Sequence, residues 1–354
     1  MAHYLITGHT GFKGSWLTLL LKSRGHEVSG LALDPLPGSL FERAHISSDL
    51  THDFRVDVRN RDGVVDSFQK AKPDVVIHMA AQALVREGYR DPTGTYETNV
   101  NGTMHVLQAS DATDSVMSQL IVTTDKVYRD DGLRRPYVES DPLGGKDPYS
   151  ASKAMADILA QEYFHNERTK PGAIARAGNV IGAGDSTKDR LLPDLGKAVI
   201  DKTDLDIRYP KSVRPWQHVL DCLLGYLEIL GHFPEHDQVA WNVGPDTNQL
   251  ATVEDVLRVA EGIIGERFPR LNQRQAEWAE DPSLRLDTTA SSRKLGLSNQ
   301  ISLKHSIEDA LGECIGEGKW DTRSHLQNSI RDFIGSQDPS EGTPDGKSYA
   351  GGAS

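Results

Sequence analysis

Short apolar runs rich in β-branched residues alternate along the chain with longer segments whose apolar positions recur at helical spacing. The six runs that predict strands are residues 3–8, 27–34, 54–58, 74–81, 119–124 and 173–180. Roughly one helical crossover separates each run from the next, which is typical of a parallel sheet covered by helices on both faces. The pattern therefore predicts an α/β fold with a doubly wound parallel sheet.

The helical segments begin and end at recognisable signals. The predicted helices include residues 14–25, 148–166, 252–265 and 303–316. The first ends at Gly25, and the second carries Pro148 in its first turn, where its missing N–H group is not needed. Both signals support a helix boundary at these points.

The composition of the chain changes beyond about residue 179, where the segments between predicted helices and strands become rich in glycine, proline and charged residues. The predicted divisions are a main domain of residues 1–178 with a return to the sheet at about 212–248, a smaller α/β lobe of residues 179–211 and 249–334, and a tail of residues 335–354. The tail has too few apolar residues to form a core, so we expect it to be disordered.

Charge argues against polyanionic partners. The 354 residues contain 39 basic and 51 acidic side chains, a net charge of -12, and no basic block. Binding to nucleic acid or to an anionic membrane therefore has little electrostatic support, and a phosphate-bearing ligand needs local donors. The apolar stretch WLTLLL is too short to span a bilayer, and no secretory leader is recognisable. We expect a cytoplasmic protein.

Cysteine and histidine usage predicts neither disulfides nor a metal. Cys222 and Cys314 belong to no ligand spacing and are expected to be reduced. His232 and His236 flank a proline without companion ligands, and an HExxH motif is absent. No GxSxG elbow occurs, so serine hydrolase chemistry has no support.

A glycine-rich turn follows the first predicted strand. Gly8, Gly11 and Gly14 stand between strand and helix, where glycines let the backbone approach a pyrophosphate at a helix N-terminus. Asp34 ends the second strand twenty residues after Gly14, where a carboxylate accepts from the adenosine ribose hydroxyls and favours NAD over NADP. The alternatives are a plain tight turn and an Asp-Pro turn without a ligand. With this motif, the doubly wound sheet becomes a predicted Rossmann domain.

Further residues complete the predicted NAD site. Asp57 lies at the end of the third predicted strand and could bind the adenine amino group, or it could be a solvent-exposed carboxylate. The small residues of the string HMAAQ would let the cofactor pass over the sheet edge, or they could serve close packing alone. The predicted cofactor-binding set is Gly8, Gly11, Phe12, Gly14, Asp34, Asp57, Val58, Ala80, Ala81, Gln82, Asn99, Tyr149 and Lys153. Within it, Asn99 is expected to fix the backbone behind the site.

Tyr149 and Lys153 lie four residues apart in a predicted helix, so their side chains share one face. A tyrosine in this arrangement can take a hydroxyl proton as hydride leaves the same carbon. The lysine is expected to stabilise the phenolate, lower its pKa and hold the nicotinamide ribose. The alternative is a pair on the surface of a helix.

Together these motifs resemble the extended short-chain dehydrogenase/reductase family that acts on nucleotide sugars. Longer strings are similar to its CDP-glucose 4,6-dehydratase branch: TGHTGFKGSWL, HMAAQALVREGY, TTDKVY, ESDPLGGKDPYSASK, RAGNVIGAGD, DRLLPD and RPWQHV. The resemblance runs from about Tyr4 to Ile334 and is strongest before residue 220. It departs from the branch pattern at Thr124, Val127, Gly88 and Asn101, which leaves the base and the hexose open.

The resemblance implies catalytic roles for the loop after the fifth strand. Tyr149 would take the proton of the carbon 4 hydroxyl as NAD takes hydride, with Thr124 holding the carbon 4 oxygen. Lys126, kept neutral by like-charge repulsion, would remove the carbon 5 proton, and a protonated Asp125 would donate to the leaving carbon 6 hydroxyl. Return of hydride to carbon 6 gives a 4-keto-6-deoxy sugar and regenerates NAD.

The same resemblance implies how the nucleotide sugar is held in the smaller lobe. Asn179, Arg190 and Arg214 would contact its pyrophosphate, because guanidinium groups match phosphate oxygens, and Arg86 would reach the sugar. The alternative for each arginine is a surface ion pair. Family members usually form homodimers through two helices per subunit, here residues 96–110 and the Tyr149 helix.

Three readings of function remain open. The first is an NAD-dependent dehydratase of CDP-glucose or of another nucleotide sugar. The second is a nucleotide-sugar 4-epimerase, which shares the first oxidation but has no use for Asp125 and Lys126, leaving them as a loop ion pair. The third is an NAD-binding protein without catalytic turnover.

Overall fold

The computed structural model describes residues 1–133, 135–165, 169–232, 238–246, 250–273, 284–316 and 320–337. Seven parallel strands form the central sheet in the order β11-β6-β5-β4-β1-β2-β3. Their bounds are β1 His3–Thr7, β2 Glu27–Ala32, β3 His52–Arg55, β4 Val75–His78, β5 Ser118–Val122, β6 Gly172–Ala177 and β11 Ala240–Val243. This order confirms the doubly wound Rossmann fold. Its crevice lies between β1 and β4, because the chain continues from β1 toward one edge of the sheet and from β4 toward the other edge.

The third strand begins and ends earlier than its predicted range of residues 54–58. β3 pairs with β2 from the Ser29–His52 pair to the Ala32–Arg55 pair, where β2 itself ends. Without a partner beyond that point, the chain leaves the ladder. Asp57 therefore lies two residues past the strand, in a loop.

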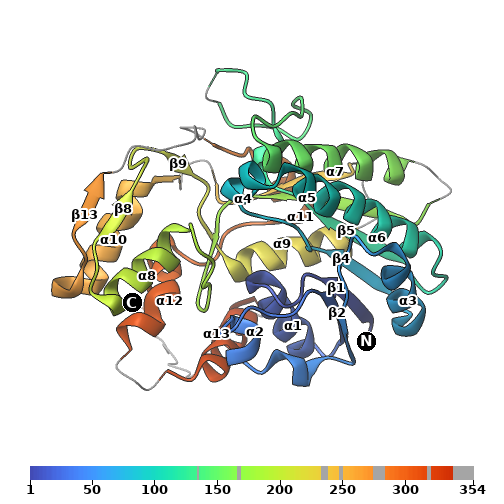
Figure 1. Ribbon diagram of the computed structural model, residues 1–354, viewed down its shortest axis with the longest axis horizontal. Helices are drawn as coiled ribbons and strands as arrows, with labels where there is room; N and C mark the ends of the chain where they lie inside the picture. Colours follow the sequence, from blue (N-terminus) through green and yellow to red (C-terminus); the bar gives the residue numbers. More distant parts are fainter. Residues whose placement is uncertain are drawn as a thin grey trace, which may run out of the picture.

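Helices cover both faces of the sheet (Figure 1). Their bounds are α1 Phe12–Ser23, α2 Leu40–Arg43, α3 Arg61–Ala71, α4 Val85–Arg90, α5 Pro92–Tyr96, α6 Gly102–Asp111, α7 Pro148–His165, α8 Leu191–Asp201, α9 Val219–Gly231, α10 Val253–Ile264, α11 Thr289–Leu295, α12 Leu303–Ile315 and α13 Thr322–Gln337. Successive side chains of a strand point to opposite faces of the sheet, so the core has two layers. Ile6 and Ile77 pack with α1, α9 and α13 on one face. Leu5 and Val76 pack with α3 and α6 on the other face. The Tyr149 helix, α7, covers the second face beside α6.

A second core belongs to the smaller lobe on the left of Figure 1. It is built from α8, α10 and α12, with residues such as Leu195, Ile207, Trp216, Leu257 and Ile307 buried among them. Short strands border it: β7 Val180–Ile181, β8 Leu205–Ile207, β9 Val213–Arg214, β10 Gln217–His218, β12 Ala251–Thr252 and β13 Leu271–Gln273. The helix α13 packs instead on α1 beneath the sheet.

The sequence-based domain boundaries remain predictions. Most of the predicted tail, residues 338–354, lies outside the described residues, as does His236. Within the described ranges, no helix combines the length and the apolar character that crossing a bilayer requires. Both cysteines are free thiols, as the sequence predicts, Cys222 on α9 and Cys314 on α12.

Candidate active site

The glycine turn between β1 and α1 packs directly on the end of β4. Gly8 has φ of +78°, and a Cβ on it would come within 2.9 Å of the Ala80 backbone nitrogen. A Cβ on Gly14 would lie 2.3 Å from the Gly8 carbonyl oxygen. Side chains are therefore excluded at both positions, the first also by its left-handed backbone. The turn and the HMAAQ segment, far apart in sequence, form one cradle.

The start of α1 leaves backbone donors for an anion. Gly11 occupies the N-cap position without a side-chain cap, Phe12 opens the helix, and the first turn carries no acidic residue. The first N–H groups of a helix have no partner within it, and the helix dipole favours negative charge there. The residues present therefore fit the pyrophosphate of a dinucleotide such as NAD.

Just beyond the carboxyl ends of β2 and β3, the two predicted carboxylates differ in their surroundings. The Asp34 side chain is 88% exposed and lies 3.9 Å from the Arg55 guanidinium. The Asp57 carboxylate accepts hydrogen bonds from the side chain and backbone of Arg59, which hold its pKa below the usual range. Val58 is buried beneath α6. Asp34 is thus open to a ligand, whereas Asp57 already has a cationic partner.

A buried chain of hydrogen bonds runs from the cradle to α7. The Asn99 amide lies in a π-helical turn, Glu97–Asn101, and accepts from the Gln82 backbone N–H at 2.9 Å. Its amide nitrogen donates to the Ser152 hydroxyl at 2.8 Å, which in turn donates to the Tyr149 carbonyl at 2.8 Å. Asn99 thus ties the backbone that follows β4 to the first turn of α7.

Tyr149 and Lys153 are both buried on α7, one turn apart. Burial raises the pKa of Tyr149 to about 12 and lowers the pKa of Lys153 to about 7. The lysine ammonium donates to the Val122 carbonyl at 3.0 Å. Burial is the largest influence on both groups, and the expected stabilisation of the phenolate by Lys153 remains a prediction.

The acid-base loop turns at the end of β5, where Thr124 caps a short 3-10 turn, Asp125–Val127. The Thr124 hydroxyl donates to Asp125 Oδ1 at 2.9 Å and also forms a hydrogen bond that acts on the Tyr149 phenol. Asp125 is only 2% exposed, and among the described residues its Oδ2 has no partner. A buried polar atom without a partner is costly, so Oδ2 is poised to meet a ligand.

Burial also raises the pKa of Asp125, although the charges of Lys126 and Arg214 act in the opposite direction. A carboxyl group with a raised pKa keeps its proton at higher pH and can serve as an acid. Lys126 is partly exposed beside it, and no hydrogen bond or ion pair is found for its ammonium within the described ranges. Acid, amine and phenol therefore converge at the carboxyl end of β5.

The predicted phosphate-binding side chains approach the same region from the smaller lobe. Arg214 of β9 is buried and close enough to Asp125 to influence its pKa, which burial raises. Arg190 precedes α8, lies 3.6 Å from Asp185, and opposes the effect of burial on the Tyr149 pKa. Arg214 is thus within electrostatic reach of Asp125, and Arg190 within electrostatic reach of Tyr149.

The remaining two predicted substrate contacts lie near the lobe boundary. Arg86 of α4 bridges to the carboxylate of Asp189, the neighbour of Arg190. Asn179 lies between β6 and β7, and its carbonyl accepts from the Gln217 backbone N–H at 3.0 Å. The assigned binding roles remain predictions.

The comparisons with known proteins agree with this geometry. Residues 4–244, more than half of the chain, match the NAD dependent epimerase/dehydratase family. The chain belongs to this family. The expected cofactor class is thereby confirmed, since NAD is the cofactor that defines the family and the cradle fits it.

Relatives within the family include dehydratases and epimerases. A CDP-glucose 4,6-dehydratase of Salmonella typhimurium is 38% identical over 85% of this chain and 87% of its own length. A probable dTDP-glucose 4,6-dehydratase of Sinorhizobium fredii is 31% identical over 89% of this chain and 93% of its own. The structure of a UDP-glucose 4-epimerase of Stenotrophomonas maltophila with bound NAD superposes with a TM-score of 0.77 at 18% identity, covering 94% of this chain and all of that one. The last likeness concerns the fold alone.

Lys13 is a member of the site that the sequence analysis missed. It stands inside the glycine motif, and its ammonium donates to the Tyr226 hydroxyl at 2.9 Å, across from α1 to α9. Burial lowers its pKa, and it influences the charge state of Lys153. The available signal was the residue type, because a lysine between two glycines of a buried turn needs a polar partner.

No group of three or more His, Cys, Asp or Glu side chains arranged to hold a metal ion occurs in the part of the chain that the structure describes.

Replacing Asp125 with Asn should raise the midpoint of thermal unfolding at neutral pH. The folded pKa of Asp125 is raised, so its contribution to stability is full below the unfolded pKa and is lost as pH rises through the folded pKa. A neutral amide removes this loss, and the difference from wild type should vanish in acid. Differential scanning fluorimetry across pH measures it.

The control is Asp141→Asn. Hydrogen bonds from Arg135 lower the Asp141 pKa, so this change should instead reduce the midpoint at neutral pH. Equal shifts in the two variants would contradict the assigned environment of Asp125.

Proposed function

We propose that this chain catalyses the NAD-dependent dehydration of a nucleotide hexose, CDP-D-glucose to CDP-4-keto-6-deoxy-D-glucose and water. The observation that carries the proposal is a buried Asp125, whose pKa burial raises, beside Lys126, both at the β5 end that Tyr149 faces. A simple alcohol oxidation needs only the phenol, whereas loss of water from carbons 5 and 6 also needs an acid and a base. The 38% identical relative named CDP-glucose 4,6-dehydratase supports the choice of substrate.

In the first step, Tyr149 takes the proton of the carbon 4 hydroxyl, and the Thr124 hydroxyl holds the resulting ketone oxygen. Bound NAD would supply a hydride acceptor for carbon 4 and a hydride donor for carbon 6. Burial raises the Tyr149 pKa to about 12, so Tyr149 acts as the base in its phenolate form, which nearby positive charge stabilises. Lys153 lies one turn away and contributes to that charge when protonated.

In the second step, the ketone acidifies the carbon 5 proton, which the neutral amine of Lys126 removes. Asp125 donates its proton to the carbon 6 hydroxyl, which leaves as water while the double bond forms between carbons 5 and 6. The raised pKa of Asp125 suits it to this role. When carbon 6 is reduced, Lys126 returns a proton to carbon 5.

The proton taken by Tyr149 and the proton lost by Asp125 balance over one turnover. Thr124 Oγ1 lies 2.9 Å from Asp125 Oδ1 and hydrogen-bonds the phenol, so it stands between the two groups. Arg86, Asn179, Arg190 and Arg214 are proposed to hold the sugar and the diphosphate. Reaction and substrate are both compatible with a cytoplasmic location and with supply of a deoxysugar pathway, for example for a surface polysaccharide.

The test is mass spectrometry of the products formed from a panel of nucleotide sugars with NAD, CDP-glucose first. Loss of one water from CDP-glucose alone supports the proposal, and loss from another member reassigns the substrate. Unchanged mass with altered configuration at carbon 4 would identify an epimerase, and Asp125 and Lys126 would then be residues of a charged turn without a catalytic role. No reaction across the panel would favour a binding protein.

We also propose a homodimer through α7 and the segment of residues 96–110 that packs beside it. Met155 and Ile158 lie three residues apart on α7 and are 49% and 54% exposed, although both are apolar. Ile158→Glu should convert a wild-type species of twice 38.9 kDa into a monomer, measured by size-exclusion chromatography with light scattering. Ile200→Glu on α8, also at an exposed isoleucine, should leave the mass unchanged. A monomeric wild type would refute the dimer.

A further inference from the structure

A fully buried ion pair lies behind the catalytic residues. Arg176 of β6 is 1% exposed and Asp157 of α7 is 0% exposed. The guanidinium binds the carboxylate through two bonds, Nε to Oδ2 at 2.9 Å and an Nη to Oδ1 at 2.7 Å. Removing both charges from water is expensive, so such a pair contributes little net stability unless its remaining hydrogen bonds are also made. Its other partners are therefore informative.

Those partners hold both ends of the acid-base loop. The Thr123 hydroxyl donates to Asp157 Oδ2 at 2.9 Å, and the Tyr128 hydroxyl accepts from an Arg176 Nη at 3.0 Å. Thr123 directly precedes the segment 124–127, and Tyr128 directly follows it. The Arg176–Asp157 ion pair is therefore hydrogen-bonded to the residues on both sides of the segment that carries Asp125.

Asp157 of this ion pair lies on α7, the helix that also carries Tyr149 and Lys153. Asp157 lies one turn beyond Lys153 and two turns beyond Tyr149, so all three share one face of α7. Because α7 carries both groups, the Asp157 carboxylate that accepts from Thr123 has a fixed position relative to the Tyr149 phenol.

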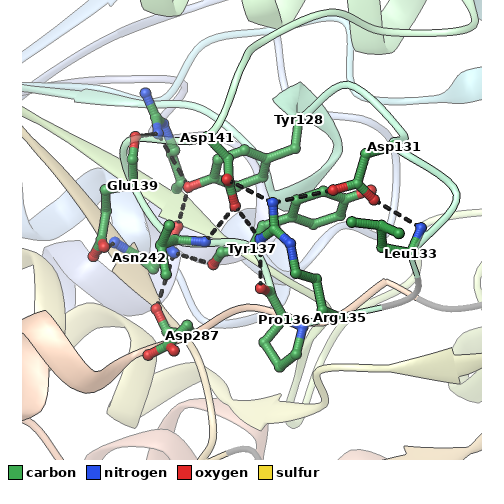
Figure 2. A network of polar contacts seen from close by, with 12 residues as sticks. Tyr128, Asp131, Leu133, Arg135, Pro136, Tyr137, Glu139, Asp141, Asn242 and Asp287 are labelled. Carbon is green, nitrogen blue, oxygen red and sulfur yellow. Dashed lines mark hydrogen bonds and ion pairs between the residues drawn. The ribbon is translucent and has the colours of Figure 1, made fainter.

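A shell of further contacts fixes Tyr128 (Figure 2). Its hydroxyl donates to Asn242 Oδ1 at 2.5 Å, and its ring stacks on Tyr137 with centroids 4.9 Å apart. The Asn242 amide nitrogen donates to the carbonyls of Tyr137 and Asp287, at 2.9 and 3.0 Å. The Glu139 carbonyl accepts from Arg176 at 2.8 Å. The position of the loop is thereby determined from three distant parts of the chain.

We propose that the Arg176–Asp157 pair is a positioning unit that sets the acid and base of the elimination step relative to Tyr149. This inference rests on the proposed function for its catalytic consequence, but not for its structural one. Misplacement of the loop should slow elimination more than oxidation, because elimination loses the positions of both its acid and its base, whereas oxidation keeps Tyr149 and Lys153 on α7 and loses only the position of Thr124.

The test severs the loop from the ion pair while leaving both charges in place. Thr123→Val and Tyr128→Phe each remove one hydroxyl at nearly constant shape, and Arg176 keeps its bonds to Asp157 and the Glu139 carbonyl. In the double variant, amide hydrogen exchange of residues 124–127 should accelerate without any ligand. Turnover should fall about 100-fold, the scale of a 1 Å misplacement, and reduced nicotinamide should accumulate on the enzyme during reaction.

Thr113→Val is the matched control, since its buried hydroxyl bonds the Ala109 carbonyl far from the loop. It should change neither the loop exchange nor the nicotinamide signal. A merely structural role would lower the unfolding midpoint of the double variant and leave both readouts at wild-type values, which would overturn the inference. Failure of wild type to dehydrate any nucleotide sugar would instead refute the proposed function, and the exchange result alone would then decide the positioning role.

Discussion

Tyr149→Phe is expected to reduce kcat for dehydration by about 1,000-fold, within the range that general acid-base catalysis contributes. The phenol is the group that takes the carbon 4 proton, and the variant removes only its hydroxyl from a buried ring. Because oxidation is the first step, no reduced nicotinamide should form when substrate is added. Product mass spectrometry and near-ultraviolet absorbance measure the two quantities.

Tyr163→Phe is the matched control. It lies on the same helix, about 21 Å further along its axis, and away from the loop. Its turnover should equal that of wild type. Near-normal dehydration by the Tyr149 variant would show that another group takes the proton, and the role of α7 in catalysis would have to be revised.

Lys126→Met is expected to reduce product formation by a similar factor, about 1,000-fold, but to stop the reaction one step later. Carbon 4 oxidation needs Tyr149 and Lys153, which the variant keeps, whereas removal of the carbon 5 proton needs the missing amine. Reduced nicotinamide should therefore accumulate to about one equivalent per site on adding CDP-glucose. Absorbance of the enzyme before and after substrate measures it.

Lys70→Met, on the exposed surface of α3, is the control and should behave as wild type. Unchanged turnover in the Lys126 variant would remove the assigned base. A variant that neither turns over nor accumulates reduced nicotinamide would instead place Lys126 in substrate binding or in the first step. Together with Tyr149→Phe, the variant separates the oxidation step from the elimination step.

The order of strands and helices could be predicted from periodicity, because a strand buried on both faces leaves a continuous apolar run. The ends were less accurate where the tertiary partner decides them. β3 stops at Arg55 because β2 ends at Ala32, and no local signal in residues 54–58 reveals this. The return of α13 to the main core also depends on long-range packing, between α1 and residues such as Leu326 and Phe333.

The candidate site divides in the same way. Gly8 and Gly14 could be predicted from the sequence, because only glycine fits at both positions. A Cβ on Gly8 would meet the Ala80 backbone, and a Cβ on Gly14 would meet the Gly8 carbonyl oxygen. Lys13 and Arg176 were missed because their partners lie about 200 and 20 residues away, on α9 and α7. A charged residue in an apolar run signals that a buried partner is required, but not which one.

The sequence by itself determined the sheet, the dinucleotide cradle, the spacing of Tyr149 and Lys153, and the residue types at the end of β5. These follow from local rules of periodicity, sterics and helical geometry. Only the tertiary structure decided the pKa shifts of the site residues and the point at which β3 ends. The pKa values of Asp125 and Tyr149 are raised, and that of Lys153 is lowered to about 7, because the folded core removes water from these groups. Desolvation is a property of the surrounding atoms, which the chain assembles from segments far apart in sequence.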